Sequence, residues 1–262
     1  MRARRKKRPR KTRKRGIYVL PNLFTSASLF AGFYAIIAGI QGRYEPAAIA
    51  ILISCVLDGL DGKIARFTNA TSHFGTEYDS LSDLVAFGVA PGILAFQWAL
   101  APFGRLGWLA AFMFVICGAL RLARFNVQKN ILNIAYFKGL PIPAAASLIA
   151  SLTLFMTALG GLPETRHILV ITLMYVLSFL MVSSIRYPSF KELELKKQKP
   201  FNMLVSIILI FIVIAYRPRI MLFFIMSIYI LSGPVVTIYQ FHRRRTTAKP
   251  ISEEVSAVNK PN

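Results

Sequence analysis

The segment DGLDGKIARFTNATSHFGTEYDSLSD, residues 58–83, holds all the aspartates of this 262-residue chain. They form two pairs, in the order Asp58, Asp61, Asp79 and Asp83. Residues three or four positions apart lie on the same face of a helix, so each pair is expected to share one face. The segment predicts two antiparallel helices whose aspartate pairs face one another, joined by a connection over residues 67–78.

Long apolar runs flank this segment on both sides. The chain is 55% hydrophobic, only 16% charged and has a mean hydropathy of +0.53, which is unusual for a soluble domain. The runs are about 17 to 25 residues long, and a helix of that length crosses a bilayer. We therefore expect an all-α integral membrane protein, a polytopic bundle of about eight transmembrane helices. Their expected positions are 22–40, 46–66, 80–100, 107–125, 143–162, 167–186, 201–216 and 220–240.

Basic residues predict the orientation of the bundle. The N-terminal run MRARRKKRPRKTRKRG contains eleven Lys or Arg, and basic segments favour the cytoplasmic side. Eight spans place 27 of the 32 Lys and Arg on that side and five on the other. We expect a multi-pass protein of the inner membrane with both termini and the aspartate segment on the cytoplasmic side. The expected parts are a basic tail over 1–17, one transmembrane domain over 18–242 and a polar tail over 243–262.

The net charge of +21 has two readings. Basic runs bind nucleic acid, but here they adjoin membrane spans, where anionic lipid attracts each basic residue by about 1 kcal/mol. We expect attraction to the membrane surface and no nucleic-acid partner; RNA binding by the first sixteen residues is the alternative.

Four carboxylates this close together repel one another unless a positive charge compensates them. Oxygen ligands without Cys or His favour Mg²⁺ or Mn²⁺, with Ca²⁺ as a third choice, over Zn²⁺. Two alternatives remain. Lys63 and Arg66 offer an ion-paired packing cluster, and the acids alone offer the ion site of a divalent-cation transporter. A transporter would need polar groups reachable from both faces, whereas these acids lie at one end of their helices.

The glycines among the acids favour a phosphorylated ligand. Gly59, Gly62 and Gly75 let a ligand or another backbone approach closely. Arg66 adds charge-assisted hydrogen bonds to phosphate, while a metal bridges phosphate oxygens.

The spacing of these residues resembles the signature of the CDP-alcohol phosphatidyltransferase family. The matching positions are Asp58, Gly59, Asp61, Gly62, Ala65, Arg66, Gly75, Asp79 and Asp83. The resemblance implies a shared core over roughly residues 18–186, with two further helices over 201–240. It also implies two bound metal ions and a homodimer.

The resemblance implies a role for each residue of the signature. Asp58, Asp61 and Asp79 would coordinate metal; Asp83 would be the general base and an additional metal ligand. The positions expected to surround the CDP moiety are Asp58, Gly62, Ala65, Arg66 and Gly75. Asn22 and Thr25, at the start of the first helix, are further candidates for nucleotide contact, although Asn22 is also an ordinary helix-start residue.

Three other segments resemble the bacterial phosphatidylserine synthases of this family: 20–36, GALRLARFN at 118–126 and FKGLPIPAAA at 137–146. The implied substrates are CDP-diacylglycerol and L-serine, and the products are phosphatidylserine and CMP. A transferase of the same family that uses glycerol 3-phosphate, a glycerol lipid or inositol is the alternative.

A cluster of polar residues near the end of the fourth helix suits the acceptor. An Arg can hold a carboxylate with two parallel hydrogen bonds, so the cluster is a candidate pocket for serine or phosphate. Its members are Arg121, Arg124, Asn126 and Lys138. For the two arginines, anchoring of a helix end at the membrane surface is the competing explanation.

Overall fold

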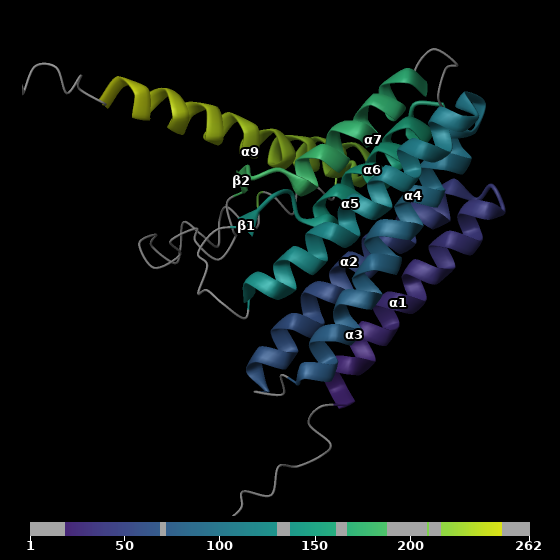
Figure 1. Ribbon diagram of the computed structural model, residues 1–262. Helices are drawn as coiled ribbons and strands as arrows, with labels where there is room; N and C mark the ends of the chain where they lie inside the picture. Colours follow the sequence, from purple (N-terminus) through teal and green to yellow (C-terminus); the bar gives the residue numbers. More distant parts are fainter. Residues whose placement is uncertain are drawn as a thin grey trace, which may run out of the picture.

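A computed structural model describes residues 19–68, 72–129, 137–160, 167–187, 209 and 216–247. Within these residues the chain is almost entirely helical (Figure 1). The helices are α1 (Val19–Ile40), α2 (Tyr44–Phe67), α3 (His73–Asp83), α4 (Ala90–Ala95), α5 (Arg105–Lys129), α6 (Ile142–Ala158), α7 (His167–Val182) and α9 (Pro218–Thr247).

The helix that carries the second aspartate pair is longer than the sequence indicated. It runs without a break from His73 to Phe103 and includes two π-helical stretches, η2 (Leu84–Val89) and η3 (Phe96–Leu100), and a short 3₁₀ turn, η4 (Ala101–Phe103). The expected start at residue 80 and most of the expected connection over 67–78 are therefore wrong. Ser72 explains the early start, because its hydroxyl accepts a hydrogen bond from the Gly75 N–H at 2.9 Å and caps α3.

Among the described residues, four helices are long and apolar enough to cross a membrane, and the two shorter helices α6 and α7 are also apolar. The four are Leu20–Ile40, His73–Phe103, Arg105–Gln128 and Pro218–Thr237. Helix α2 has the length of a span at 24 residues, but acids and bases interrupt its apolar sequence. The chain is thus a helical membrane protein. The eight-span count remains a prediction, since the expected helix 201–216 lies almost wholly outside the described residues.

Other boundaries also shift. Helix α6 ends at Ala158 and α7 at Val182, each four residues before the expected end, whereas α9 continues to Thr247, past the expected boundary at 242. Pro141 stands at the N-cap of α6 and Pro143 in its first turn, which are ordinary positions for proline at a helix start. A two-residue antiparallel ladder, β1 (Phe137–Lys138) with β2 (Arg186–Tyr187), was not expected in an all-α chain.

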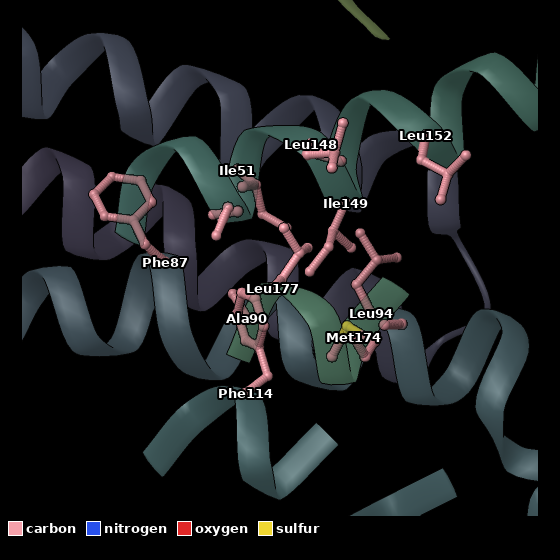
Figure 2. Packing of buried hydrophobic residues seen from close by; sticks show 14 of the residues in the cluster. Ile51, Phe87, Ala90, Leu94, Phe114, Leu148, Ile149, Leu152, Met174 and Leu177 are labelled. Carbon is pink, nitrogen blue, oxygen red and sulfur yellow. The ribbon is translucent and has the colours of Figure 1, made fainter. Parts of the chain in front are cut away.

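The core of the bundle lies between α2, the helix His73–Phe103, α5, α6 and α7 (Figure 2). Ile51, Phe87, Phe114, Ile149 and Leu177 are buried there with an exposed fraction of at most 2%. The outer faces of the helices keep large apolar side chains exposed, among them Phe30, Phe33, Trp108, Phe112, Phe179 and Ile228. Such surfaces suit contact with lipid tails rather than water.

Glycine allows α1 to pack closely against the helix His73–Phe103. A Cβ added at Gly32 would lie 2.6 Å from the Cα of Ala86, and backbone cannot move away as a flexible side chain can. Small residues at such crossings let membrane helices approach each other.

We expect Gly32→Ala to destabilise the fold by about 1–3 kcal/mol, because overpacking forces backbone shifts. Thermal unfolding of the purified protein in detergent measures the effect. Gly59→Ala is the matched control, since a Cβ at that helical glycine meets no atom within 4 Å. Equal melting temperatures for both variants would contradict the close packing of α1 on Ala86.

Candidate active site

The structure brings three of the four aspartates together. Asp58 and Asp61 lie in the second half of α2, and Asp79 lies in α3. One carboxylate oxygen from each can be chosen so that the three lie within 4.8 Å of one another. Asp58 and Asp61 thus meet Asp79 because α2 and α3 run antiparallel beside each other (Figure 1).

Asp83 completes the group from the last turn of α3. Its carboxyl group is hydrogen-bonded to that of Asp58 and lies within electrostatic range of Asp79 and Asp61. Asp83 is therefore placed where a carboxylate can accept or release a proton beside the three-aspartate cluster.

The donor set suits a hard divalent cation. All three clustered side chains offer carboxylate oxygens, and Asp58 and Asp79 are only partly buried, so a ligand can reach them. Magnesium and manganese prefer oxygen donors and keep positions for phosphate oxygens or water. The cluster can therefore hold a divalent cation.

Helix α1 supports the cluster from the side. The Thr25 hydroxyl donates to Asp61 Oδ2 at 2.8 Å and is 4% exposed. The Ser82 hydroxyl donates to the Thr25 carbonyl at 3.2 Å, which links α1 to α3. Asn22 lies beside Gly75, where an added Cβ would come within 3.3 Å of the Asn22 side-chain oxygen. Two candidate nucleotide residues of α1 are thus next to the aspartate helices.

We expect Thr25→Val to raise the metal concentration needed for half-maximal activity by about 10- to 100-fold, the usual cost of removing a group that orients a metal ligand. The substitution conserves volume but removes the hydrogen bond to Asp61. A metal titration of turnover measures the shift. Thr68→Val is the control, because Thr68 is exposed and its hydroxyl donates to the Ile64 carbonyl, four residues earlier in the chain. An unchanged metal requirement in Thr25→Val would contradict the orienting role.

The expected acceptor residues divide into different environments. The Asn126 side-chain amide donates to Ser80 Oγ at 2.9 Å, next to Asp79. Arg121 is 8% exposed and lies within electrostatic range of Asp83. Arg124 instead donates to the Val182 carbonyl at 3.2 Å, at the end of α7. The structure thus brings Asn126 and Arg121 to the aspartates, while Arg124 also holds two helices together.

For four other expected site residues, the structure gives the position in the chain but no side-chain contact that bears on the site. Gly62 lies in α2 directly after Asp61. Ala65 and Arg66 follow in the last turns of α2, and Lys138 lies in β1, opposite Arg186 in the ladder. The side chains of Ala65, Arg66 and Lys138 are outside the described part of the structure.

Hydroxyl groups connect the helices in ways that the sequence did not reveal. Ser28 and Ser54 join α1 to α2 through a 2.7 Å contact between their Oγ atoms, and Ser26 contacts the Tyr78 hydroxyl at 2.9 Å. The only signal in the sequence was the presence of small polar residues inside apolar runs, and such residues often join membrane helices.

The aspartate cluster lies within a part of the chain that matches a known protein family. Residues 18–182 match the model for CDP-alcohol phosphatidyltransferase. The chain belongs to the CDP-alcohol phosphatidyltransferase family. The resemblance drawn from the aspartate and glycine spacing is thereby confirmed. In this transferase, the three-aspartate cluster is formed by aspartates of that signature.

Curated relatives agree with this assignment. The chain is similar to a CDP-diacylglycerol–serine O-phosphatidyltransferase of Helicobacter pylori, with 40% identity over 83% of this chain and 90% of the relative. It is 36% identical to the Bacillus subtilis protein of the same name, over 66% of this chain and 92% of that protein. It is 39% identical to an archaetidylserine synthase of Methanothermobacter thermautotrophicus, over 64% and 69% of the two chains.

Proposed function

We propose that the protein transfers the phosphatidyl group of CDP-diacylglycerol to the hydroxyl of L-serine, giving phosphatidylserine and CMP. The observation that carries the proposal is the three-aspartate cluster with Asp83 bonded to it, in a chain that aligns along most of its length with serine O-phosphatidyltransferases. In this reaction the serine oxygen forms a bond to the β-phosphorus, the bond from that phosphorus to CMP breaks, and the hydroxyl proton leaves.

Asp58, Asp61 and Asp79 would hold Mg²⁺ or Mn²⁺, with Asp83 as an additional ligand, and we expect two ions. A divalent cation bound there would neutralise the pyrophosphate and the departing CMP. Thr25 keeps the Asp61 carboxylate in one orientation. Asn22 and Gly75, which lie side by side, are proposed to contact the nucleotide together with Gly62, Ala65 and Arg66.

Asp83 is proposed to take the proton from the serine hydroxyl. A general base must lie within hydrogen-bond reach of that proton, and Asp83 lies at the edge of the cluster where the reacting phosphorus would be held. It lies one helical turn after Asp79 in α3, beside the proposed metal ligands.

Arg121 is proposed to bind the serine carboxylate. Its guanidinium is buried and lies within electrostatic range of Asp83, the proposed base for the serine hydroxyl. A buried guanidinium binds a carboxylate strongly, because water does not compete for the hydrogen bonds between the two groups. Asn126 is placed to assist through Ser80.

The aspartate end of the bundle is proposed to lie at the cytoplasmic face of the inner membrane. The basic asymmetry of the sequence supports this orientation, and serine and CMP would exchange there with the cytoplasm. The lipid tails would lie in the same leaflet, against the exposed apolar faces of the helices. A homodimer is the expected assembly, on the basis of the family resemblance.

The test is release of CMP by purified protein in detergent, with CDP-diacylglycerol and Mn²⁺ or Mg²⁺. The acceptors compared are L-serine, L-alanine, glycerol 3-phosphate and inositol. L-Alanine keeps the carboxylate and ammonium of serine but has no hydroxyl, so it should inhibit without releasing CMP. Turnover with glycerol 3-phosphate or inositol in place of serine would overturn the serine assignment. Absence of metal-dependent turnover with every acceptor would overturn the transferase proposal for this site.

A further inference from the structure

A pair of buried serines joins α1 to α2 close to the three-aspartate cluster. Ser28 and Ser54 have exposed fractions of 1% and 0%, and their Oγ atoms lie 2.7 Å apart. Each side chain also reaches the backbone of the other helix. The Ser54 hydroxyl donates to the Ser28 carbonyl at 3.0 Å, and Ser28 Oγ lies 3.2 Å from the Ser54 carbonyl. Ser28 and Ser54 together are called the serine clasp below.

The serine clasp lies on the same helix faces as the residues of the site. On α1, Ser28 follows Thr25 by three residues, and on α2, Ser54 precedes Asp58 by four. Residues at these spacings share one face of a helix. The face of α1 that bonds to Asp61 through Thr25, at 2.8 Å, is therefore the face that carries the clasp.

Many of the other buried residues of α1 and α2 give weak control over how the two helices are aligned. They are alanines, whose short side chains let helices approach closely but interdigitate little. A buried polar pair specifies the alignment better, because a slide of one helix leaves its polar groups without partners in an apolar interior. The alanines with an exposed fraction of at most 5% are Ala35, Ala38, Ala47, Ala48 and Ala50.

A change in the alignment of α1 on α2 would disturb the support of the aspartates. A slide by one residue is about 1.5 Å, which is enough to break the 2.8 Å hydrogen bond from Thr25 to Asp61. The bond from Ser82 to the Thr25 carbonyl ties this part of α1 to α3. The serine clasp supplies the corresponding tie to α2, the helix that carries Asp61.

We infer that the serine clasp positions the metal site: it sets the alignment of α1 on α2 that brings the Thr25 hydroxyl to the Asp61 carboxylate. The inference rests on the proposed function, which places a divalent cation at the aspartate cluster. Ser28 and Ser54 act through Thr25 and touch neither the cation nor the reacting atoms, so they are positioning residues.

The test is binding of Mn²⁺ to the purified protein in detergent without substrates, measured by electron paramagnetic resonance of the free ion. Ser28→Ala with Ser54→Ala removes both hydroxyls together, so no buried hydroxyl is left unpaired and the fold should survive. We expect the Kd for Mn²⁺ to rise about tenfold, the lower end of the effect of losing a group that orients a metal ligand.

Ser151→Ala is the matched control. Ser151 is 0% exposed, and its hydroxyl donates to the Leu148 carbonyl of its own helix, α6, at 3.1 Å. This variant also loses a buried hydroxyl, but its Kd for Mn²⁺ should equal that of wild type. Melting temperatures of all variants show how much of any change is a general loss of stability.

Two further variants test the path through Thr25. In a Thr25→Val background, the double alanine substitution should change the Kd for Mn²⁺ by less than about twofold, because coupled residues do not contribute additively. If the double variant does not fold, Ser28→Ala decides, since Ser54 can still donate to the Ser28 carbonyl. Its Kd should lie above that of wild type.

A lowered melting temperature with an unchanged Kd for Mn²⁺ would overturn the inference, as would equal effects of the clasp substitutions with and without Thr25→Val. CMP release with L-serine is measured on the same preparations. If wild type binds Mn²⁺ but does not use serine, the proposed acceptor fails and the Mn²⁺ data alone decide the inference. If wild type binds no Mn²⁺, the cation site fails and the inference fails with it.

Discussion

Asp83→Asn should reduce serine-dependent release of CMP by about 10²- to 10⁴-fold, the range that a general base contributes. The amide has the shape of the carboxyl group but cannot take up the hydroxyl proton. The side chain remains inside the same group of acids, so its size and its burial at the end of α3 are preserved. CMP release at saturating serine and CDP-diacylglycerol measures the loss.

Two controls separate proton transfer from other losses. Glu77→Gln neutralises an exposed acid on the same helix and should retain wild-type turnover. Raising the Mn²⁺ concentration should not restore Asp83→Asn if the missing function is the base. Recovery of Asp83→Asn turnover at high Mn²⁺ would show that Asp83 serves mainly as a metal ligand. Wild-type turnover of Asp83→Asn at the ordinary Mn²⁺ concentration would refute its role as the general base.

Asp61→Asn should lower turnover at a fixed metal concentration by at least about a hundredfold, since a neutral amide is a weaker ligand and the cation carries much of the stabilisation of the transferred phosphate. The amide oxygen can still accept the hydrogen bond from Thr25, so the local fold should survive. The measurement is CMP release across a range of Mg²⁺ and Mn²⁺ concentrations.

The same role predicts the response of the wild-type protein to chelation. EDTA should abolish CMP release, and excess Mg²⁺ or Mn²⁺ should restore it. Glu45→Gln is the matched variant, because it neutralises an acid at the opposite end of α2; its metal requirement should equal that of wild type even if its melting temperature falls. Full turnover in EDTA would rule out a divalent cation at the aspartate cluster.

The sequence allowed much of the site to be anticipated, because helix periodicity places each aspartate pair on one face of its helix and the short connection between the pairs lets the two helices run antiparallel. The start of α3 was missed because polar residues were assigned to a connection, although Ser72 is an ordinary helix-capping residue. The β1–β2 ladder has two residues on each side, which is too short for any periodic pattern to reveal.

Contacts between distant segments were harder to anticipate. Thr25 was a candidate only through its place in the first helix, and its hydrogen bond to Asp61 depends on how α1 crosses α2. Tyr187 gave no signal either, and its hydrogen bond to the Ile230 carbonyl at 3.3 Å depends on how α9 passes β2, which no local pattern encodes.

The π-helical stretch directly after Asp83 separates two faces of one helix. Its hydrogen bond from the Ala90 N–H to the Val85 carbonyl spans five residues instead of the four of an α-helix. The extra residue turns everything beyond it by about 100° relative to a regular helix. Asp79 and Asp83 can therefore face the aspartate cluster while Ala90 and Leu94, beyond the stretch, face the buried core, so one inserted residue gives the two parts of this helix different buried faces.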